Sequence, residues 1–115
     1  MKNEFGFTLT KVPYLPDGYI LERLIGIERE NAKIAHIILS DGLSTLSIFQ
    51  KYEVENSGSF QHGAGEIDII HTDTSTILKK WIGNYKVGLV GELPVEEMKK
   101  ILYGIESYLG NLTMK

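Results

Sequence analysis

The sequence predicts an α+β fold, with one antiparallel sheet of six or seven strands and a single C-terminal helix packed on a face of the sheet. Three observations carry this prediction. An Asp-Gly pair separates two strand-like runs within residues 33–50, and this pair between apolar runs is among the strongest hairpin signals. Residues 66–90 contain three runs of alternating or strand-like character. Residues 95–109 carry apolar side chains at helical spacing, which predicts a helix with one apolar face.

Length and composition indicate one domain. The chain has 115 residues, enough for a single core. We expect residues 13–110 to form this domain and residues 111–115 to form a tail. Residues 1–12 are expected to be an N-terminal segment or linker, or alternatively to contain a short strand.

Charge and composition exclude several classes of function. The formal net charge is −3, from 12 basic and 15 acidic residues without a basic cluster, so nucleic acid is not expected as a partner. The absence of cysteine excludes disulfides, zinc thiolate sites and cysteine nucleophiles. No run is long enough to span a bilayer, so direct membrane insertion is not expected. Residues 1–7 lack the apolar region of a signal peptide.

The first ordered feature is an entry turn. Pro13 and Pro16 forbid a helix at this point, and Pro16-Asp17-Gly18 predicts a turn. Residues 19–28 then predict a strand. A period of two places Tyr19, Leu21, Ile25 and Ile27 on one face of it, and the polar residues 28–32 predict a hairpin loop.

The central hairpin spans residues 33–50. We expect a two-residue type I′ turn at Asp41-Gly42. The following strand then places Leu46 and Ile48 on one face and Thr45 and Ser47 on the other. The first arm is apolar on both faces, which predicts a strand that is covered on both sides or packed under the helix.

Residues 51–65 form the longest irregular stretch, and their small and polar side chains predict an exposed, mobile loop. A meander of three strands follows. Its first strand, over residues 66–72, directs Ile67 and Ile69 inward. The second covers residues 75–82 and the third residues 85–90, with a favoured two-residue hairpin turn at Gly83-Asn84 between them.

The helix has signals at both ends. Pro94 suits the first helical position, and Gly110 is a natural C-terminal stop. Gly104 lies within the helix, where close packing on a strand would explain it. The apolar face comprises Val95, Met98, Ile101, Leu102, Ile105 and Leu109.

The sequence specifies no catalytic or metal site. His36 is interpreted as a satisfied, semi-buried histidine, and His62 has no partner at ligand spacing. The set Asp68, His71 and Asp73 is more suggestive of a metal site, but Asp68 and His71 point to opposite faces of a strand, so a shared metal would require a bulge.

Turn chemistry explains Ser40 and Asp41 without a catalytic triad. The Gly-Ala-Gly run at residues 63–65 lacks the helix and the lysine of a phosphate loop. We therefore expect a binding or regulatory module that needs no cofactor and is not an enzyme.

An exposed sheet edge and nearby aromatic residues are the predicted partner-binding surface. An edge strand can pair with an extended segment of a partner. The candidate residues are Tyr14, Tyr52, Trp81 and Tyr85, chosen because tryptophan and tyrosine are enriched at interfaces. Trp81 has the alternative interpretation of core or edge packing.

Three segments in order resemble one known family. They are Leu15-Pro16-Asp17-Gly18-Tyr19, Ser40-Asp41-Gly42-Leu43-Ser44-Thr45-Leu46-Ser47-Ile48-Phe49, and Val90-Gly91-Glu92-Leu93-Pro94 with the helix after it. Together they resemble the C-terminal domain of the RseB/MucB family over roughly residues 13–106. The residues that carry the motifs are Pro16, Gly18, Asp41, Gly42, Gly91 and Pro94. They fall at turns and at a helix start, so they argue for fold more than for function.

The resemblance implies a non-catalytic, periplasmic or otherwise extracytoplasmic module. Family members bind an anti-sigma factor and so act in negative regulation of an extracytoplasmic-stress sigma factor. The implied partner is the extracytoplasmic segment of an anti-sigma factor, or a carrier-like domain of the parent protein. The family's N-terminal lipid-binding domain is missing here, which favours an excised domain or a short relative. The alternative function is an extracytoplasmic sensor or scaffold domain of a sporulation or anti-sigma-type membrane protein.

Overall fold

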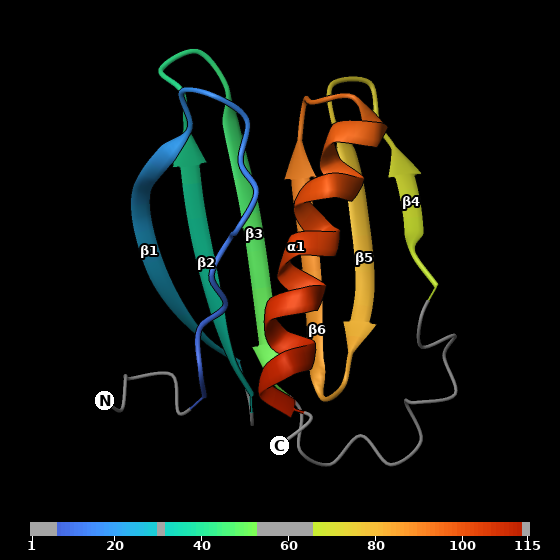
Figure 1. Cartoon of the computed structure of the whole chain (residues 1–115). Coiled ribbons are helices and arrows are strands. Elements are labelled where there is room, and N and C mark those ends of the chain that lie inside the picture. Colours follow the sequence, from blue (N-terminus) through green and yellow to red (C-terminus); the bar gives the residue numbers. More distant parts are fainter. Residues whose placement is uncertain (1–6, 30–31, 53–65, 114–115) are drawn as a thin grey trace.

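A single antiparallel sheet of six strands organises the computed structural model, which describes residues 7–29, 32–52 and 66–113. The strand order is β1-β2-β3-β6-β5-β4, so two three-stranded meanders lie side by side and meet where β3 pairs with β6 (Figure 1). One C-terminal helix, α1, packs on one face, which confirms the predicted α+β class. The elements are β1 (Ile20–Arg29), β2 (Ala32–Ser40), β3 (Thr45–Tyr52), β4 (Asp68–His71), β5 (Thr76–Ile82), β6 (Tyr85–Gly91) and α1 (Val95–Thr113).

Two segments cover the same face of the sheet. Helix α1 packs on β5 and β6. Residues 7–18, which we call the N-terminal strap, run beside the helix in front of β2 and β3 (Figure 1). The strap contains no strand among its described residues, so the alternative of a short first strand is wrong for residues 7–12.

A fully buried glutamine ties the strap to the sheet. The Gln50 side-chain amide donates to the Thr8 carbonyl at 2.9 Å, and its oxygen accepts the Thr10 N–H at 2.8 Å. The strap is therefore hydrogen-bonded to β3 without adding a strand to the sheet.

The core lies between the sheet and its two covering segments. Burial alternates along β3 and β6, as a sheet with one covered face requires. The predicted apolar face of α1 is confirmed, with only Val95 half-buried and the other members fully buried. The core comprises Tyr19, Ile37, Leu39, Leu46, Ile48, Leu78, Ile82, Tyr85, Val87, Leu89, Met98, Ile101, Leu102, Ile105 and Leu109.

The central hairpin forms where predicted, but with a different turn. Ser40 pairs with Thr45, so the connection has four residues and the predicted two-residue type I′ turn is wrong. The Asp41 carboxylate accepts the N–H groups of Ser44 at 2.7 Å and Leu43 at 2.9 Å. These bonds hold the pKa of Asp41 below its usual value. They stabilise the longer turn, while Gly42 supplies the positive φ of 94°.

Strand β1 begins with a bulge that changes which side chains share a face. Leu21 pairs with Leu39, but Arg23 pairs with Ile38, so one extra residue is accommodated between them. The predicted common face for Tyr19, Leu21, Ile25 and Ile27 is therefore wrong. After the bulge, Ile25 and Ile27 pair with His36 and Ile34 and face away from the helix.

The helix begins and ends differently from the prediction. It starts at Val95, directly after Pro94, whose carbonyl accepts the Met98 N–H at 3.0 Å. It continues through Gly110 to Thr113, so the predicted stop is wrong; Gly110 does not take the left-handed conformation of a C-terminal cap. Gly104 contacts the strap and not a strand, because a Cβ there would lie 3.5 Å from Pro13.

The second meander follows the prediction closely. Ile82 pairs with Tyr85 across the Gly83-Asn84 turn, and Gly83 has a φ of 61°. Ile67 packs partly against the core, but Ile69, on the outermost strand, is 40% exposed. The predicted mobile loop begins at Lys51, but Lys51 and Tyr52 are the last residues of β3, so its start is wrong. The rest of that loop, residues 53–65, lies outside the described residues together with His62 and the Gly-Ala-Gly run.

Candidate functional site

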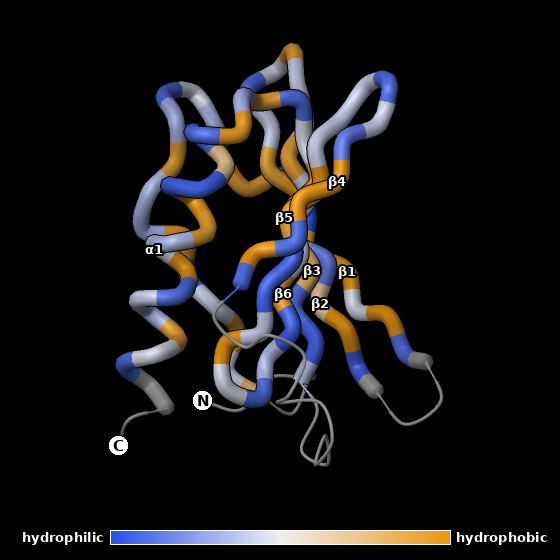
Figure 2. Tube along the Cα trace, turned by 90° about the vertical axis from the view of Figure 1, so that its right-hand side faces the viewer, coloured by the Kyte–Doolittle hydropathy of each residue, from blue (hydrophilic) through white to orange (hydrophobic). Residues whose placement is uncertain are grey.

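The face of the sheet opposite α1 is the candidate site. Figure 2 shows the sheet from the side, with the helix on one side and no described element on the other. We call this surface the open face. The strand register defines its residues: Ile25, His36, Phe49, Gly88, Lys79 and Asp68 form one row across all six strands.

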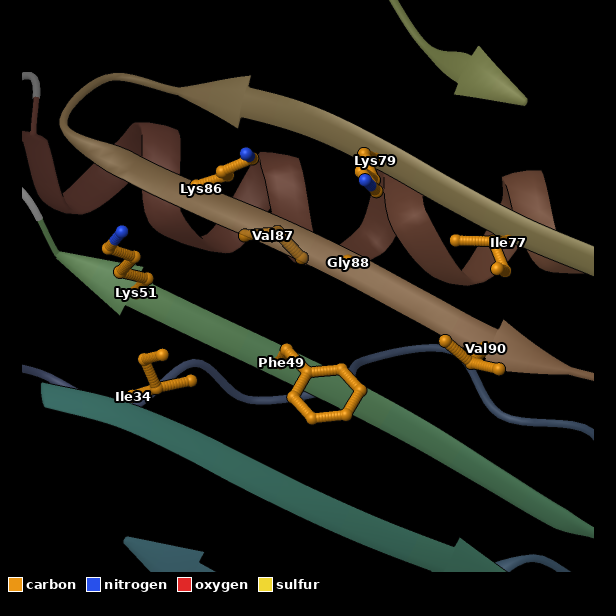
Figure 3. Close-up of a pocket in the computed structure, with 9 residues that line it drawn as sticks. All are labelled: Ile34, Phe49, Lys51, Ile77, Lys79, Lys86, Val87, Gly88 and Val90. Carbon is orange, nitrogen blue, oxygen red and sulfur yellow. The ribbon is translucent and has the colours of Figure 1, made fainter. Parts of the chain in front are cut away.

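An apolar groove of about 350 Å³ crosses the open face. Gly88 forms part of its floor and lies in register between Phe49 on β3 and Lys79 on β5. Because Gly88 has no side chain, the surface of the sheet is recessed between the side chains of Phe49 and Lys79. Figure 3 shows the lining side chains in front of the strands, with α1 behind them. The groove is lined by Ile34, Phe49, Lys51, Ile77, Lys79, Lys86, Val87, Gly88 and Val90.

Phe49 forms one wall and is held in place by a neighbour. Its ring stacks on the His36 ring with centroids 4.2 Å apart and planes inclined by 20°. The His36 Nε2 lies 3.1 Å from the Ser47 hydroxyl oxygen. Burial lowers the pKa of His36, and the nearby Arg23 charge lowers it further. His36 is therefore a half-buried, hydrogen-bonded histidine, as predicted.

Lysines form the rim of the groove. Lys51, Lys79 and Lys86 extend from three adjacent strands. The Lys86 ammonium lies 5.8 Å from the centre of the Trp81 ring, within the range of a cation–π contact. Arg23 also faces this side, because it pairs with Ile38 after the bulge.

The open face is basic although the chain is acidic. Its described strand positions carry four cationic side chains, namely the three rim lysines and Arg23, against two carboxylates, Asp68 and Glu22, the extra residue of the bulge. This gives a local charge of about +2 (4 − 2) on a chain with a net charge of −3. The groove thus combines an apolar floor with a cationic border.

The four predicted contact residues do not gather at one place. Trp81 lies on the open face beside the rim. The Tyr14 hydroxyl donates to the Glu97 carboxylate of α1 at 2.9 Å, and this bond raises the pKa of Tyr14. Tyr52 and Tyr85 face the helix side, with ring centroids 5.1 Å apart. Tyr85 is buried and Tyr52 half-buried. Their partner-binding role stays a prediction.

The two sheet edges are β1 and β4. All four residues of β4 are exposed. On β1, Ile20 is 68% exposed and Leu21 58% exposed. Within the described part of the chain no strand pairs with the outer side of β1 or β4, and both carry exposed apolar side chains. Pairing of an extended partner with an edge also stays a prediction.

The sequence motifs meet at one corner of the molecule. A Cβ on Gly18 would lie 3.5 Å from the Cβ of Asp41, and one on Gly91 would lie 2.9 Å from the Leu46 Cδ1. The Tyr19 N–H donates to the Pro16 carbonyl at 3.3 Å, which closes the predicted turn. Burial raises the pKa of Tyr19, and the Asp41 carboxylate raises it further. The motifs thus stabilise the entry turn, the β2–β3 turn and the end of β6.

Sequence reasoning missed the groove and Gln50. The groove residues are dispersed over four strands, and no local pattern shows that they face the same side. A signal was available in β6, where the outward positions are Lys86, Gly88 and Val90, so a glycine without a side chain lies between two large residues. No group of three or more potential metal ligands occurs among the described residues, Asp68, His71 and Asp73 included. No helix in the described part of the chain is long and apolar enough to cross a membrane.

Comparison with known proteins places this geometry beside one family. A family model described as the MucB/RseB C-terminal domain matches residues 3–106. The crystal structure of MucB in complex with MucA(peri) matches with a TM-score of 0.63 and 20% sequence identity, over 84% of this chain and 35% of that one. The complex structure of Pseudomonas aeruginosa MucA/MucB matches with a TM-score of 0.62 and 20% identity, over 84% and 34%.

The likeness to these structures concerns the fold of one part of MucB. The chain spans about a third of the MucB chains that it matches. No curated protein matches the sequence.

Proposed function

The chain belongs to the MucB/RseB C-terminal domain family, and from this premise we propose that it is a non-catalytic module that binds the extracytoplasmic segment of an anti-sigma factor. Through this binding it would contribute to negative regulation of an extracytoplasmic-stress sigma factor. The observation that carries the proposal is the match to MucB in two structures that are complexes with MucA. At 20% sequence identity the two matches show that the folds are alike. Binding of an anti-sigma factor by this chain is therefore proposed.

The structure supports a binding role through its uncovered sheet face. Apolar side chains line a groove that no described element fills. Contiguous exposed apolar surface with a polar rim is typical of interaction sites. The groove has room for side chains of a partner, and its rim offers ion pairs to them.

We place the module outside the cytoplasm, again by its family. MucA(peri), the partner in one of the matching structures, is the periplasmic part of MucA by its name. The alternative partner, a carrier-like domain of the parent protein, has no support in the comparisons.

The direct test is calorimetric titration of the 115-residue chain with the extracytoplasmic segment of the anti-sigma factor encoded in the same genome. We expect saturable binding at micromolar or lower Kd, a binding free energy of about −8 kcal/mol or more favourable. A scrambled segment of equal composition is the control. A folded chain, verified by circular dichroism, that gives no heat of binding would contradict the proposal and favour the sensor or scaffold role.

A further inference from the structure

We propose that the groove on the open face binds an extended segment of a partner protein in which carboxylate side chains alternate with apolar ones. The inference deepens the proposed function and rests on it, because it names the surface and the segment chemistry that such a binding module uses. Three features carry it: the shape of the groove, its apolar walls and the sign of its rim.

The shape fits side chains of an extended chain. The volume of about 350 Å³ lies at the lower end of the range for ligand pockets, roughly 300–1,000 Å³. Gly88 adds no side chain to the floor between Phe49 and Lys79. An extended segment directs alternate side chains to one side, about 6.6 Å apart. Its apolar side chains can therefore enter the groove, whose apolar lining includes Phe49, Ile77 and Val90.

The positive charges at the rim of the groove favour a negatively charged partner segment. Lys51, Lys79 and Lys86 border the groove, and Arg23 lies on the same face. In an extended segment the carboxylates between these apolar side chains point away from the floor, so they would interact with the rim cations at the mouth of the groove. Partial exclusion of water there strengthens the attraction. Elsewhere the chain carries a net negative charge, which repels an acidic partner. Charge complementarity thus directs an acidic segment to the groove.

A second copy of this chain is a poorer occupant. A two-fold interface places the same patch of both subunits face to face. Here that would bring two sets of rim lysines together at the groove, and like charges opposed across an interface cost binding free energy. The occupant that the charges favour is therefore an acidic segment of a different protein.

The test uses two synthetic nine-residue peptides titrated into the ¹⁵N-labelled 115-residue chain. In one peptide Leu alternates with Asp, and in the other Lys replaces every Asp. We expect the acidic peptide to bind and to shift the amide signals of Phe49, Gly88 and Lys79. We expect the basic peptide to bind at least about tenfold more weakly, and the affinity of the acidic peptide to fall as salt is raised.

Two variants locate the site. In Gly88→Val the new side chain fills the floor, and its Cβ would lie no closer than 3.8 Å to the Leu78 carbonyl oxygen, which is an ordinary contact. Lys79→Met with Lys86→Met removes two rim charges and keeps the stems. Each should weaken binding of the acidic peptide about tenfold or more. The matched control, Lys99→Met with Lys100→Met on α1, removes the same charge from the other side of the molecule and should leave the Kd unchanged.

Several results would overturn the inference. Unchanged Kd values in both groove variants would place the peptide elsewhere, and preference for the basic peptide would reject the charge argument. Binding of vesicles of anionic lipid, lost in Gly88→Val, with no binding of the peptide would make the occupant a membrane surface. A dimer in sedimentation analysis that Gly88→Val dissociates would make it a second copy.

The same variants separate this inference from the proposed function. If the anti-sigma segment binds the unmodified chain and both groove variants equally well, only the groove assignment fails. If the acidic peptide binds in the groove and the anti-sigma segment does not bind, only the proposed partner fails.

Discussion

Among the glycines that the structure describes, Gly91 leaves the least space for an added methyl group. It ends β6 on the side of the sheet that faces the helix, and it belongs to the segment that resembles the family. A Cβ at this position would lie 2.9 Å from the Leu46 Cδ1. Leu46 is fully buried, so its side chain has little freedom to move away. The requirement for glycine here comes from packing and not from backbone conformation, since its φ is not positive.

We therefore expect Gly91→Ala to destabilise the fold by about 1–3 kcal/mol, as overpacking of a buried site does. Urea unfolding followed by circular dichroism measures this. Gly110→Ala is the matched control, because a Cβ there meets no atom within 4 Å and the residue lies in α1. Alanine is the better helix former, so this control should gain up to about 1 kcal/mol. Equal stabilities of the two variants would contradict the packing argument.

At the scale of elements, the N-terminal strap completes the core. Helix α1 packs on β5 and β6, and the strap passes over β2 and β3 beside it (Figure 1). Phe7, Val12 and Leu15 pack against the core from this segment. The described strap residues form no strand, and the buried side chain of Gln50 makes two hydrogen bonds to their backbone. The Thr8 backbone also hydrogen-bonds Tyr85. Buried polar groups of this kind are costly when they lose a partner.

Replacing Gln50 with Leu tests this role. The change keeps an apolar side chain of similar size but removes the partners of the Thr10 N–H and the Thr8 carbonyl. We expect a loss of about 1–3 kcal/mol in the free energy of unfolding, and faster hydrogen exchange at the Thr10 amide. Thr45→Ala, an exposed change on the same strand, should stay within about 0.5 kcal/mol of the unmodified chain. Unaltered exchange at Thr10 in Gln50→Leu would show that the strap is held by other contacts.

At the scale of the whole molecule, two meanders share one core. In the described sheet, the strands of the first meander (β1, β2 and β3) pair with those of the second (β4, β5 and β6) where β3 meets β6. Core residues come from both halves, for example Leu39 and Ile48 from the first and Leu78 and Leu89 from the second. Each meander alone would leave half of this core exposed to water. The two halves are therefore expected to unfold together.

We expect a single cooperative transition in urea, with a slope of about 1–3 kcal/mol per M, as for other small domains. Fluorescence of Trp81 reports on β5, and ellipticity at 222 nm reports mainly on α1. The two midpoints should coincide, and Gly91→Ala should lower both by the same amount. Separate midpoints would indicate that the meanders unfold independently.

Local sequence patterns determined most of the elements. The alternation along residues 45–50 and 75–90 correctly assigned β3, β5 and β6, because one face of each strand is buried. The period of α1 correctly assigned its buried face, and Gly83-Asn84 correctly predicted its turn. These features depend on residues that are close to one another in the chain, so the order of residue types is enough to predict them.

Tertiary structure alone decided the features that depend on distant partners. The bulge after Leu21 follows from the pairing of β1 with β2, and a shift of one residue moves every later side chain to the other face. The position of the strap depends on Gln50, which is about 40 residues away in the chain. The groove exists only because the strand order places Phe49, Gly88 and Lys79 side by side. Local patterns along the chain therefore specified the strands, the helix and the turns at residues 16–19 and 83–84, but not the four-residue turn after Ser40 or the end of α1. The packing of the sheet decided which side chains form the candidate site.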